Sequence, residues 1–506
     1  MSRLKRNIFA NFAGQGWSAV MALAFVPIYI KFLGIEAYGL IGFFAMLQAS
    51  FQVLDLGLSQ TMNREMARYS VLPDKSVEAR DLVRTLEVGY WAIGIVIGVL
   101  LLAMAPFIAG HWIKSSLIPA QTVQQAVMIM GVVTAIQWPL SFYEGGLMGL
   151  QKQVLSNSIK IGMATLNSCG AAFILWKVSP TITAFFTWQV IVAILYVALI
   201  TFFLWRSLPE AECVPRFNLQ AARNIWRFAA GMSGIGVSAI ILMQIDKIIL
   251  SKLLSLEMFG YYILAATICN VIPNMLAGPV FNATFPRLSS LVILNDESAM
   301  TLLYHQGTQL MAVLALPISF VISFFSYDIL ILWTGTTKIA LTASPIVSFL
   351  VIAMAINAIT VLTYALQLAH GWTSIGLRIN IFFIVTFVPT IYYMTTHYGA
   401  VGAAQAWLLL NCIYVLISLP LTHRRILKGE LHRWIFVDVA PPLVSAFIVV
   451  GVGRWLVPGH LSDMQSIAAL ATVFLCALSA AAIAARHTRT WILDKLTRNL
   501  PSRASL

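Results

Sequence analysis

The sequence has few charged residues. Only 10% of its 506 residues are Asp, Glu, Lys or Arg, against roughly 25% in soluble globular proteins. So little charge cannot cover a water-exposed surface of this size, which overrides the several soluble domains that the length alone would suggest. Apolar residues make up 59% of the chain, in continuous runs that do not alternate with polar residues and so argue against a β-barrel. The composition predicts an all-α polytopic membrane protein.

The sequence also lacks the residue patterns of common catalytic and metal sites. Its five cysteines lie far apart, with no Cys-x-x-Cys pair and no histidine at metal-ligand spacing, so we expect neither a disulfide nor a metal site. The glycine-rich stretch 231–236 is not part of a nucleotide-binding loop, because no Gly-Lys-Ser/Thr motif occurs in the chain. No Ser/His/Asp, Cys/His or paired-carboxylate arrangement stands out. We therefore expect no enzyme, no metal and no cofactor.

Acidic residues are scarcer than basic ones. The chain has 19 Asp and Glu against 32 Lys and Arg, a net charge of +13. Such a charge can indicate nucleic-acid binding, but in membrane proteins Lys and Arg accumulate in the cytoplasmic loops. We therefore expect these residues to lie against membrane lipid and expect no nucleic acid as a partner.

Fourteen apolar runs are long enough to cross a membrane, which takes about 20 residues in a helix. Arg3, Lys5 and Arg6 precede the first run, and no small-residue cleavage site follows, so we expect a retained helix rather than a signal peptide. An even number of spans, with both termini in the cytoplasm, places most Lys and Arg in cytoplasmic segments. The predicted spans are 8–30, 39–61, 86–110, 123–148, 154–176, 181–205, 226–250, 257–282, 302–326, 340–368, 376–396, 399–421, 435–457 and 464–485.

A short motif near the N-terminus recurs in the second half of the chain. Residues 31–39 read Lys-Phe-Leu-Gly-Ile-Glu-Ala-Tyr-Gly, and residues 252–260 keep the Lys, a Leu, the Glu, an aromatic residue and the final Gly. We call the separation along the chain between Lys31 and Lys252 the repeat offset. Trp188 and Trp407 are separated by nearly the same offset.

The repeat predicts how the chain is organised. Because six helices separate the copies, we expect two parallel lobes related by an axis along the membrane normal. The predicted parts are an N-terminal six-helix lobe (1–205), a cytoplasmic linker (206–225), a C-terminal six-helix lobe (226–421), two additional transmembrane helices (435–485) and a basic cytoplasmic tail (486–506).

Several short motifs occur in the two predicted lobes. In the first lobe they are Asn-x-x-x-Gln at 11–15, Pro-x-Tyr at 27–29, Leu-Gly-x-Glu-x-Tyr-Gly at 33–39, Leu-Asp-Leu-Gly-Leu at 54–58, Asn-Arg at 63–64 and Gly-Leu-Gln-Lys at 149–152. In the second lobe they are Asp-Lys at 246–247, Leu-Glu-x-Phe-Gly-x-Tyr at 256–262, Phe-Pro-x-Leu-Ser at 285–289 and Gly-Ala-Val-Gly-Ala-Ala at 399–404. Together they resemble the motifs of the Wzx-type polysaccharide flippases of the multidrug/oligosaccharidyl-lipid/polysaccharide (MOP) superfamily. Many flippases of this type have twelve spans, whereas fourteen resembles the lipid II flippase branch.

The resemblance implies a function at the bacterial inner membrane. A member of this family is expected to move an undecaprenyl-diphosphate-linked oligosaccharide from the cytoplasmic to the periplasmic leaflet by alternating access, with an ion gradient as a candidate driving force. The headgroup would cross between the two lobes. A polysaccharide polymerase and a chain-length regulator are the implied protein partners.

Charged residues inside apolar helices are the candidate site residues, because they are costly there and usually face a partner or a water-filled cavity. A diphosphate-linked glycan is anionic, so its path needs cations and polar groups. The predicted substrate-binding residues are Arg64, Lys160, Lys247, Arg287 and Arg378. The predicted ion-coupling residues are Asp55, Glu144 and Asp246.

Each of these assignments has a structural alternative. Lys247, late in the seventh span, would attract the diphosphate while Asp246 carries a coupling proton, because two adjacent charges point in different directions and rarely satisfy each other. Alternatively, Lys247 reaches the outer interface and Asp246 neutralises a neighbour. Arg64 can form bidentate contacts with phosphate at the cytoplasmic mouth. Alternatively, it pairs with Glu65 as a cytoplasmic anchor.

The remaining candidates are placed by their spans. Asp55 is expected in the middle of the second span and Glu144 near the cytoplasmic end of the fourth, where each can bind a proton or cation, or bond to another helix. Lys160 and Arg378, which are also separated by nearly the repeat offset, would form a symmetric cationic pair lining the cavity, or two interfacial anchors. The repeated motif itself is expected to cap turns, with Glu36 in a structural role.

Two other functions fit part of the sequence. A multidrug or cation antiporter of the same superfamily would have an acidic cavity, whereas the charges within the predicted spans lean cationic. A membrane polysaccharide polymerase would be expected to carry a large external loop with Arg or His residues. The longest external segments, near 110–123 and 326–340, are short.

Overall fold

The computed structural model describes residues 3–72, 75–210, 213–219, 238, 241–457 and 463–490. Within these residues, eleven helical stretches are long and apolar enough to cross a membrane, so the chain is a multi-pass membrane protein, as predicted. Most of the predicted helix 226–250, with the glycine-rich stretch 231–236, lies outside the described residues. So do part of the predicted linker 206–225 and residues 491–506 of the predicted tail.

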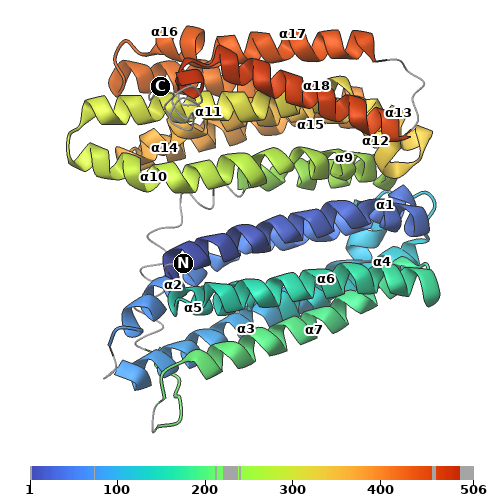
Figure 1. Ribbon diagram of the computed structural model, residues 1–506. Helices are drawn as coiled ribbons and strands as arrows, with labels where there is room; N and C mark the ends of the chain where they lie inside the picture. Colours follow the sequence, from blue (N-terminus) through green and yellow to red (C-terminus); the bar gives the residue numbers. More distant parts are fainter. Residues whose placement is uncertain are drawn as a thin grey trace, which may run out of the picture. The chain divides into compact units, whose positions relative to one another are not determined.

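The chain divides into two compact units, Met1–Gly260 and Tyr261–Leu506. Figure 1 labels the α-helices of the first unit. The elements of this unit are α1 (Arg3–Phe51), the 3₁₀ turn η1 (Gln52–Asp55), α2 (Leu58–Tyr69), α3 (Ser76–Phe107), the π-helical turn η3 (Ile108–Trp112), α4 (Ala120–Gln137), α5 (Leu140–Gly149), α6 (Gln153–Lys177) and α7 (Ile182–Ser207). A helical segment at 241–253 leads to the end of this unit.

The second unit is also all helical over the residues described. Its elements are most of α9 (Leu256–Cys269), the π-helical turn η4 (Pro273–Ala277), α10 (Gly278–Ile293), α11 (Glu297–Phe324), α12 (Ser326–Thr334), α13 (Thr337–Ile359), α14 (Val361–Ala369), α15 (Thr373–Arg425), α16 (Leu431–Arg433), the π-helical turn η5 (Trp434–Val439), α17 (Ala440–Leu456) and α18 (Asp463–Ala484). The last two helices pack on each other and on α11.

Two of the long helices are broken by a glycine. Gly34 in α1 has φ 80° and ψ 166°, and Gly399 in α15 has φ 61° and ψ −144°. Only glycine adopts such backbone angles without strain, so each glycine ends one helix and starts another. Gly34 falls between the predicted spans 8–30 and 39–61, and Gly399 is the first residue of the predicted span 399–421.

The predicted end of the second span, at residue 61, is wrong. The backbone leaves the helix at Leu56 and Gly57, with φ of 48° and 79°, and α2 then begins at Leu58. Asp55 therefore lies at the end of a 3₁₀ turn next to a break, and not in the middle of a helix. There its carboxylate accepts hydrogen bonds from the Ser59 hydroxyl at 2.8 Å and the Ser59 N–H at 3.4 Å.

Helix breaks recur at the offset of the sequence repeat. Helix α5 begins at Leu140 after Pro139, and α14 begins at Val361 after Thr360, so the two starts are separated by the repeat offset. Helix α5 packs on α2 in the first unit, and α14 packs on α10 in the second. Broken helices at matching positions of two repeats are a common feature of transporters.

The two copies of the repeated motif contact each other through equivalent residues of the first unit. A Cβ atom on Gly39 would lie 2.5 Å from the carbonyl oxygen of Leu256, and a Cβ atom on Gly260 would overlap the carbonyl oxygen of Ile35. Gly39 and Gly260 are separated by the repeat offset, as are Ile35 and Leu256. Such reciprocal contacts are the signature of a two-fold relation.

The short loop between η3 and α4 bonds to both copies of the motif. Glu36, which is 3% exposed, accepts hydrogen bonds from the Ser115 hydroxyl (2.8 Å), the Ser116 N–H (2.7 Å) and the Leu117 N–H (3.0 Å). The preceding Lys114 donates to the carbonyl oxygen of Leu253 at 3.0 Å in the second copy. These contacts agree with the structural role expected for the motif.

Candidate functional site

The first unit contains a polar cavity of about 270 Å³ among apolar helices. Its lining includes residues on both sides of the junction between α4 and α5, at Trp138 and Pro139. Gln48 of α1 and Gln137 of α4 bond to each other across it at 2.5 Å. The residues lining the cavity are Gln48, Gln52, Asp55, Thr134, Gln137, Trp138, Leu140, Ser141 and Glu144.

Two of the predicted ion-coupling residues, Asp55 and Glu144, line this cavity together. Asp55 accepts a hydrogen bond from the hydroxyl of Tyr90 on α3, which is 1% exposed, in addition to its bonds from Ser59. Glu144 accepts from the hydroxyl of Tyr196 on α7 at 2.6 Å. These partners are neutral donors, so they stabilise the carboxylates without cancelling their charge. The cavity can therefore accept a cation or a proton.

A third carboxylate, Glu87 of α3, lines a neighbouring cavity of about 500 Å³. It accepts from the Tyr143 hydroxyl at 2.8 Å and from Trp205 Nε1 at 3.3 Å, and it pairs with Arg84 at 2.8 Å. The lining includes side chains that are more than half exposed, which is typical of a groove on the outside of a helix bundle in lipid. The lining residues are Glu87, Trp91, Ile136, Tyr143, Ile194, Val197, Ala198, Thr201 and Phe202.

Several of these residues are absent from the sequence prediction. Glu87 lies in the first turn of the predicted span 86–110, so its charge within an apolar segment was a usable signal. Tyr90, Tyr143 and Tyr196 carry no such signal, since tyrosine is common in membrane helices. Only the packing of α3, α5 and α7 shows that each of them meets a carboxylate.

The third predicted ion-coupling residue, Asp246, is placed differently. It is 1% exposed and pairs with Lys247 at 3.2 Å, and Lys247 also donates to the Met243 carbonyl at 3.0 Å. The expectation that these adjacent charges would point apart is wrong, because the flexible lysine chain folds back along its own helix. The pairing agrees with the alternative that Asp246 neutralises a neighbour.

The other predicted cations lie on helix surfaces. Arg64 of α2 has a side chain 54% exposed and bonds Glu65 at 2.6 Å, the contact of its structural alternative. Lys160 of α6 is half-buried, and Arg287 of α10 and Arg378 of α15 are exposed. Among the described residues, no Lys or Arg lines either cavity of the first unit. The charged residues that line these two cavities are the acidic residues Asp55, Glu87 and Glu144.

Metal ligands do not gather in the described parts of the chain. No group of three or more His, Cys, Asp or Glu residues there has the arrangement to hold a metal ion.

The chain is similar to several known membrane proteins. It is 20% identical over 415 residues to a Shigella flexneri protein assigned provisionally as an O-antigen transporter, a match that covers 80% of this chain and 94% of that protein. Its fold is similar to the lipid II flippase MurJ in an inward closed conformation, with a TM-score of 0.69, 14% identity and coverage of 96% and 99% of the two chains. An inward-facing MATE multidrug resistance transporter of the MOP superfamily gives a TM-score of 0.67 at 15% identity, with coverage of 82% and 96%.

The family itself is identified by a sequence match. The model of the polysaccharide biosynthesis protein family matches residues 4–292, which is more than half of the chain. This agrees with the family resemblance carried by the short motifs and with the expectation of a transporter rather than an enzyme. The protein therefore belongs to the polysaccharide biosynthesis protein family and has the fold of the MOP-superfamily transporters.

Proposed function

We propose that the protein moves an undecaprenyl-diphosphate-linked oligosaccharide from the cytoplasmic to the periplasmic leaflet of the bacterial inner membrane by alternating access. The observation that carries the proposal is the polar cavity at Asp55 and Glu144 within a family of polysaccharide biosynthesis proteins. A polar cavity among apolar helices is costly, so its presence in a membrane protein indicates a transport or coupling site. The relation to an O-antigen transporter supports the substrate class.

Fourteen spans with both termini in the cytoplasm form the proposed topology. The stretch Ala10–Asp55 has 46 residues, and a helix of that length would be about 69 Å long, more than twice the roughly 30 Å membrane core. It therefore counts as two spans that meet at Gly34, and Leu377–Arg425 counts as two that meet at Gly399. The predicted span 226–250, which lies largely outside the described residues, completes the number.

Asp55 and Glu144 are the proposed coupling residues. Each carboxylate accepts a hydrogen bond from a tyrosine hydroxyl, a donor without charge, so an entering proton or monovalent cation would be held at the cavity. Binding and release of that cation would change the charge next to the helix breaks at Gly57 and Pro139, where the backbone can bend. Asp246 remains a third candidate, with a weaker claim because it already pairs with Lys247.

The cationic residues are proposed to bind the diphosphate. Arg64 would exchange Glu65 for phosphate oxygens, because a guanidinium binds phosphate through two parallel hydrogen bonds. Lys160, Lys247, Arg287 and Arg378 would assist along the path. A polysaccharide polymerase and a chain-length regulator would act on the delivered product, which makes them the proposed partners.

The test replaces the two cavity carboxylates together, with Asp55→Asn and Glu144→Gln. We expect lipid-linked glycan to accumulate on the cytoplasmic leaflet and surface polysaccharide to be lost, with protein level unchanged. The matched control is Glu78→Gln on the same unit, because Glu78 is exposed and pairs with Lys75 at the surface. Normal surface polysaccharide in the double variant would overturn the assignment of the cavity.

Export of cationic drugs is a second candidate function, because the cavity is acidic and the fold is shared with a MATE transporter. It predicts that cells expressing the protein expel ethidium and that the double variant does not. This function would be favoured over the first by two results together: ethidium export in cells that express the protein, and normal glycan translocation in a strain from which its gene is deleted.

A further inference from the structure

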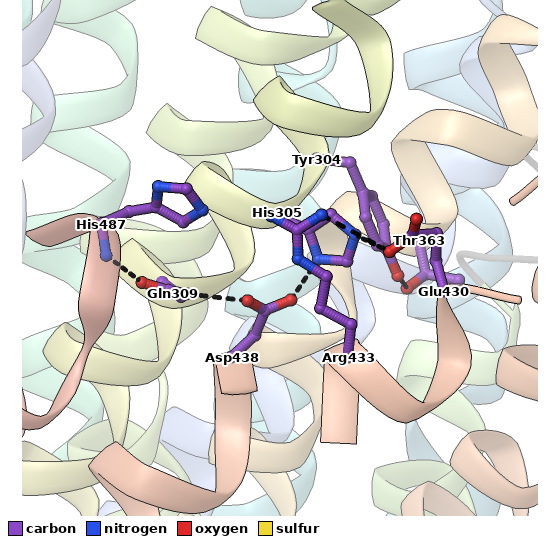
Figure 2. A network of polar contacts seen from close by, with 8 residues as sticks. All are labelled: Tyr304, His305, Gln309, Thr363, Glu430, Arg433, Asp438 and His487. Atoms are coloured by element: carbon purple, nitrogen blue, oxygen red, sulfur yellow. Dashed lines mark hydrogen bonds and ion pairs between the residues drawn. The ribbon is translucent and has the colours of Figure 1, made fainter. Parts of the chain in front are cut away.

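The second unit contains a buried polar cluster to which none of the predicted site residues belongs. His305 of α11 lies between two carboxylates: its Nδ1 contacts Asp438 Oδ2 on η5, and its Nε2 lies 3.1 Å from Glu430 Oε2 (Figure 2). His305 and Asp438 are both 0% exposed. So polar a group inside a membrane unit needs a full set of partners.

Each carboxylate of the cluster has a second donor. Asp438 Oδ1 accepts from Gln309 Nε2 at 2.8 Å, and Gln309 Oε1 accepts from the backbone N–H of His487 at 2.9 Å, as Figure 2 shows. Glu430 lies 3.6 Å from Arg433. Donors of this kind favour the ionised form of a carboxylate.

The geometry at His305 requires a proton. A neutral imidazole has one N–H and one lone pair, so it can donate to only one carboxylate and would turn a lone pair toward the other. With both carboxylates ionised, both ring nitrogens must carry hydrogen. The charges of His305, Asp438, Glu430 and Arg433 then sum to zero, and loss of the proton would leave a negative charge in a buried place.

We propose that His305, Asp438 and Glu430 form a proton-binding site, with the proton held on the imidazole ring and exchanged with water through Glu430. A metal ion is a poorer occupant, because the described residues contain no group arranged to hold one. The site extends the transport proposal by naming the proton as a coupling ion. That role rests on the proposed function, whereas proton binding itself does not.

Glu430 is suited to be the point of exchange. Its side chain is 30% exposed, whereas Asp438 is fully buried. It follows Gly429, whose φ of 84° marks a sharp turn between α15 and α16. Movement of this turn would open the Glu430 contact with His305 while the contact with Asp438 stays closed, so binding and release of the proton would follow the position of the turn.

Other titratable groups surround the cluster, and none of them replaces its proton. Burial and the nearby Arg433 lower the pKa of the His487 imidazole, which keeps it neutral near pH 7. The groups that face the cluster from the helices packed around it are Tyr304 on α11, His423 on α15, Arg433 on α16 and His487 after α18. Arg486, which is exposed, acts on His487.

Nitrogen-15 NMR of the full-length chain in lipid bilayers, labelled at its eight histidines, tests the proposal without any substrate. The spectra are recorded at a pH about one unit above the ordinary imidazole pKa of about 6.5, where a free histidine ring is mostly neutral. There we expect the signal that disappears in His305→Gln to be that of a doubly protonated ring. Asp438→Asn should convert this signal to that of a neutral ring. Glu430→Gln should slow exchange of its ring protons with water.

The control is His397→Gln, because His397 is exposed on α15 and bonds a backbone carbonyl and a neighbouring threonine. It should remove a different signal and leave the doubly protonated one. A neutral His305 ring in the wild-type protein at the same pH would overturn the proposal. If His305→Gln does not accumulate, the signal that shifts in Glu430→Gln, a partly exposed position, identifies the same ring. A failed glycan assay would refute the transport proposal and leave this result intact.

Discussion

The two units hold the carboxylates of their polar sites in different ways. In the first unit, Asp55 and Glu144 face tyrosine hydroxyls at a cavity. In the second, Asp438 faces the imidazole of His305 with no exposed surface. A phenol with a pKa of about 10 is a neutral donor near pH 7, whereas an imidazole of about 6.5 can supply its own positive charge. The charges of Asp55 and Glu144 can be balanced only by a cation that enters the cavity, whereas the charge of Asp438 can be balanced by the protonated ring of His305.

The comparison is informative because the backbones of the units share a repeat. At the repeat offset, Glu87 corresponds to Thr308 and Glu144 to Ala365. His305 corresponds to Arg84, the surface partner of Glu87. The helix starts at Leu140 and Val361 and the motif glycines are kept in both halves, whereas Glu87, Glu144 and His305 are not. The repeat therefore specifies the bending points, and each unit has its own chemistry.

The largest effect is expected from breaking the charge compensation of the second unit. Asp438→Ala would leave the imidazolium of His305 buried and half unpaired, so we expect a loss of about 3–5 kcal/mol in the free energy of unfolding. Unfolding of the purified protein in detergent, followed by temperature or denaturant, measures it. Asp55→Ala, at a half-buried residue with neutral donors, should cost less than half as much.

The double variant His305→Leu with Asp438→Leu sharpens this result. Replacing both members of a buried charged pair by apolar residues removes the desolvation penalty together with the attraction, so most of the lost stability should return. A double variant as unstable as Asp438→Ala would show that the cluster stabilises the unit by shape rather than by charge.

The next largest effect is expected at the glycines of the repeated motif, Gly39 and Gly260, which both halves share. Gly39→Ala and Gly260→Ala each place a methyl group against a backbone carbonyl, of Leu256 and Ile35 respectively, so we expect each to cost about 1–3 kcal/mol. Because the contacts are reciprocal, the two losses should be equal within error when measured by thermal unfolding. Gly89→Ala, a helix position with nothing near its Cβ, is the control and should not destabilise. Unequal losses would contradict the two-fold relation of the motif copies.

A smaller effect is expected at the tyrosines of the first unit. Tyr196→Phe removes the 2.6 Å hydrogen bond to Glu144 and keeps the ring, so the free energy of unfolding should fall by about 1.5 kcal/mol. Tyr90→Phe, which removes the donor to Asp55, should have a similar effect. Glycan translocation measured against pH should shift in both variants. An unchanged pH profile would separate these carboxylates from the transport step.

The smallest effect on stability is expected at Arg64. Its guanidinium is mostly exposed, and ion pairs of this kind contribute less than about 1 kcal/mol, so Arg64→Ala should barely change the unfolding temperature. If Arg64 binds the diphosphate, glycan translocation should nevertheless fall, and Arg64→Lys should restore it only in part. Arg68→Ala is the matched control, because Arg68 is a similarly exposed neighbour that also lies near Glu65. Equal loss of transport in both variants would point to general surface charge.

The membrane class, the helical runs and the offset of the repeat could be read from the sequence. These properties depend on local composition, because about 20 apolar residues in a row have few other ways to satisfy their backbone in lipid. The separate spans around Gly34 and Gly399 were predicted for the same reason. The break at Leu56 and Gly57 was missed, since the apolar run continues through it.

Which charges meet which partners was decided by the tertiary structure alone. Asp55 meets Tyr90 and His305 meets Asp438 across 35 and 133 residues, and those pairings depend on how each helix is rotated against its neighbour. A sequence shows that a charge lies in an apolar span, which is why Asp55 and Glu144 could be chosen. It does not show that Asp246 would form an ion pair with Lys247, or that His305 would lie between the carboxylates of Asp438 and Glu430.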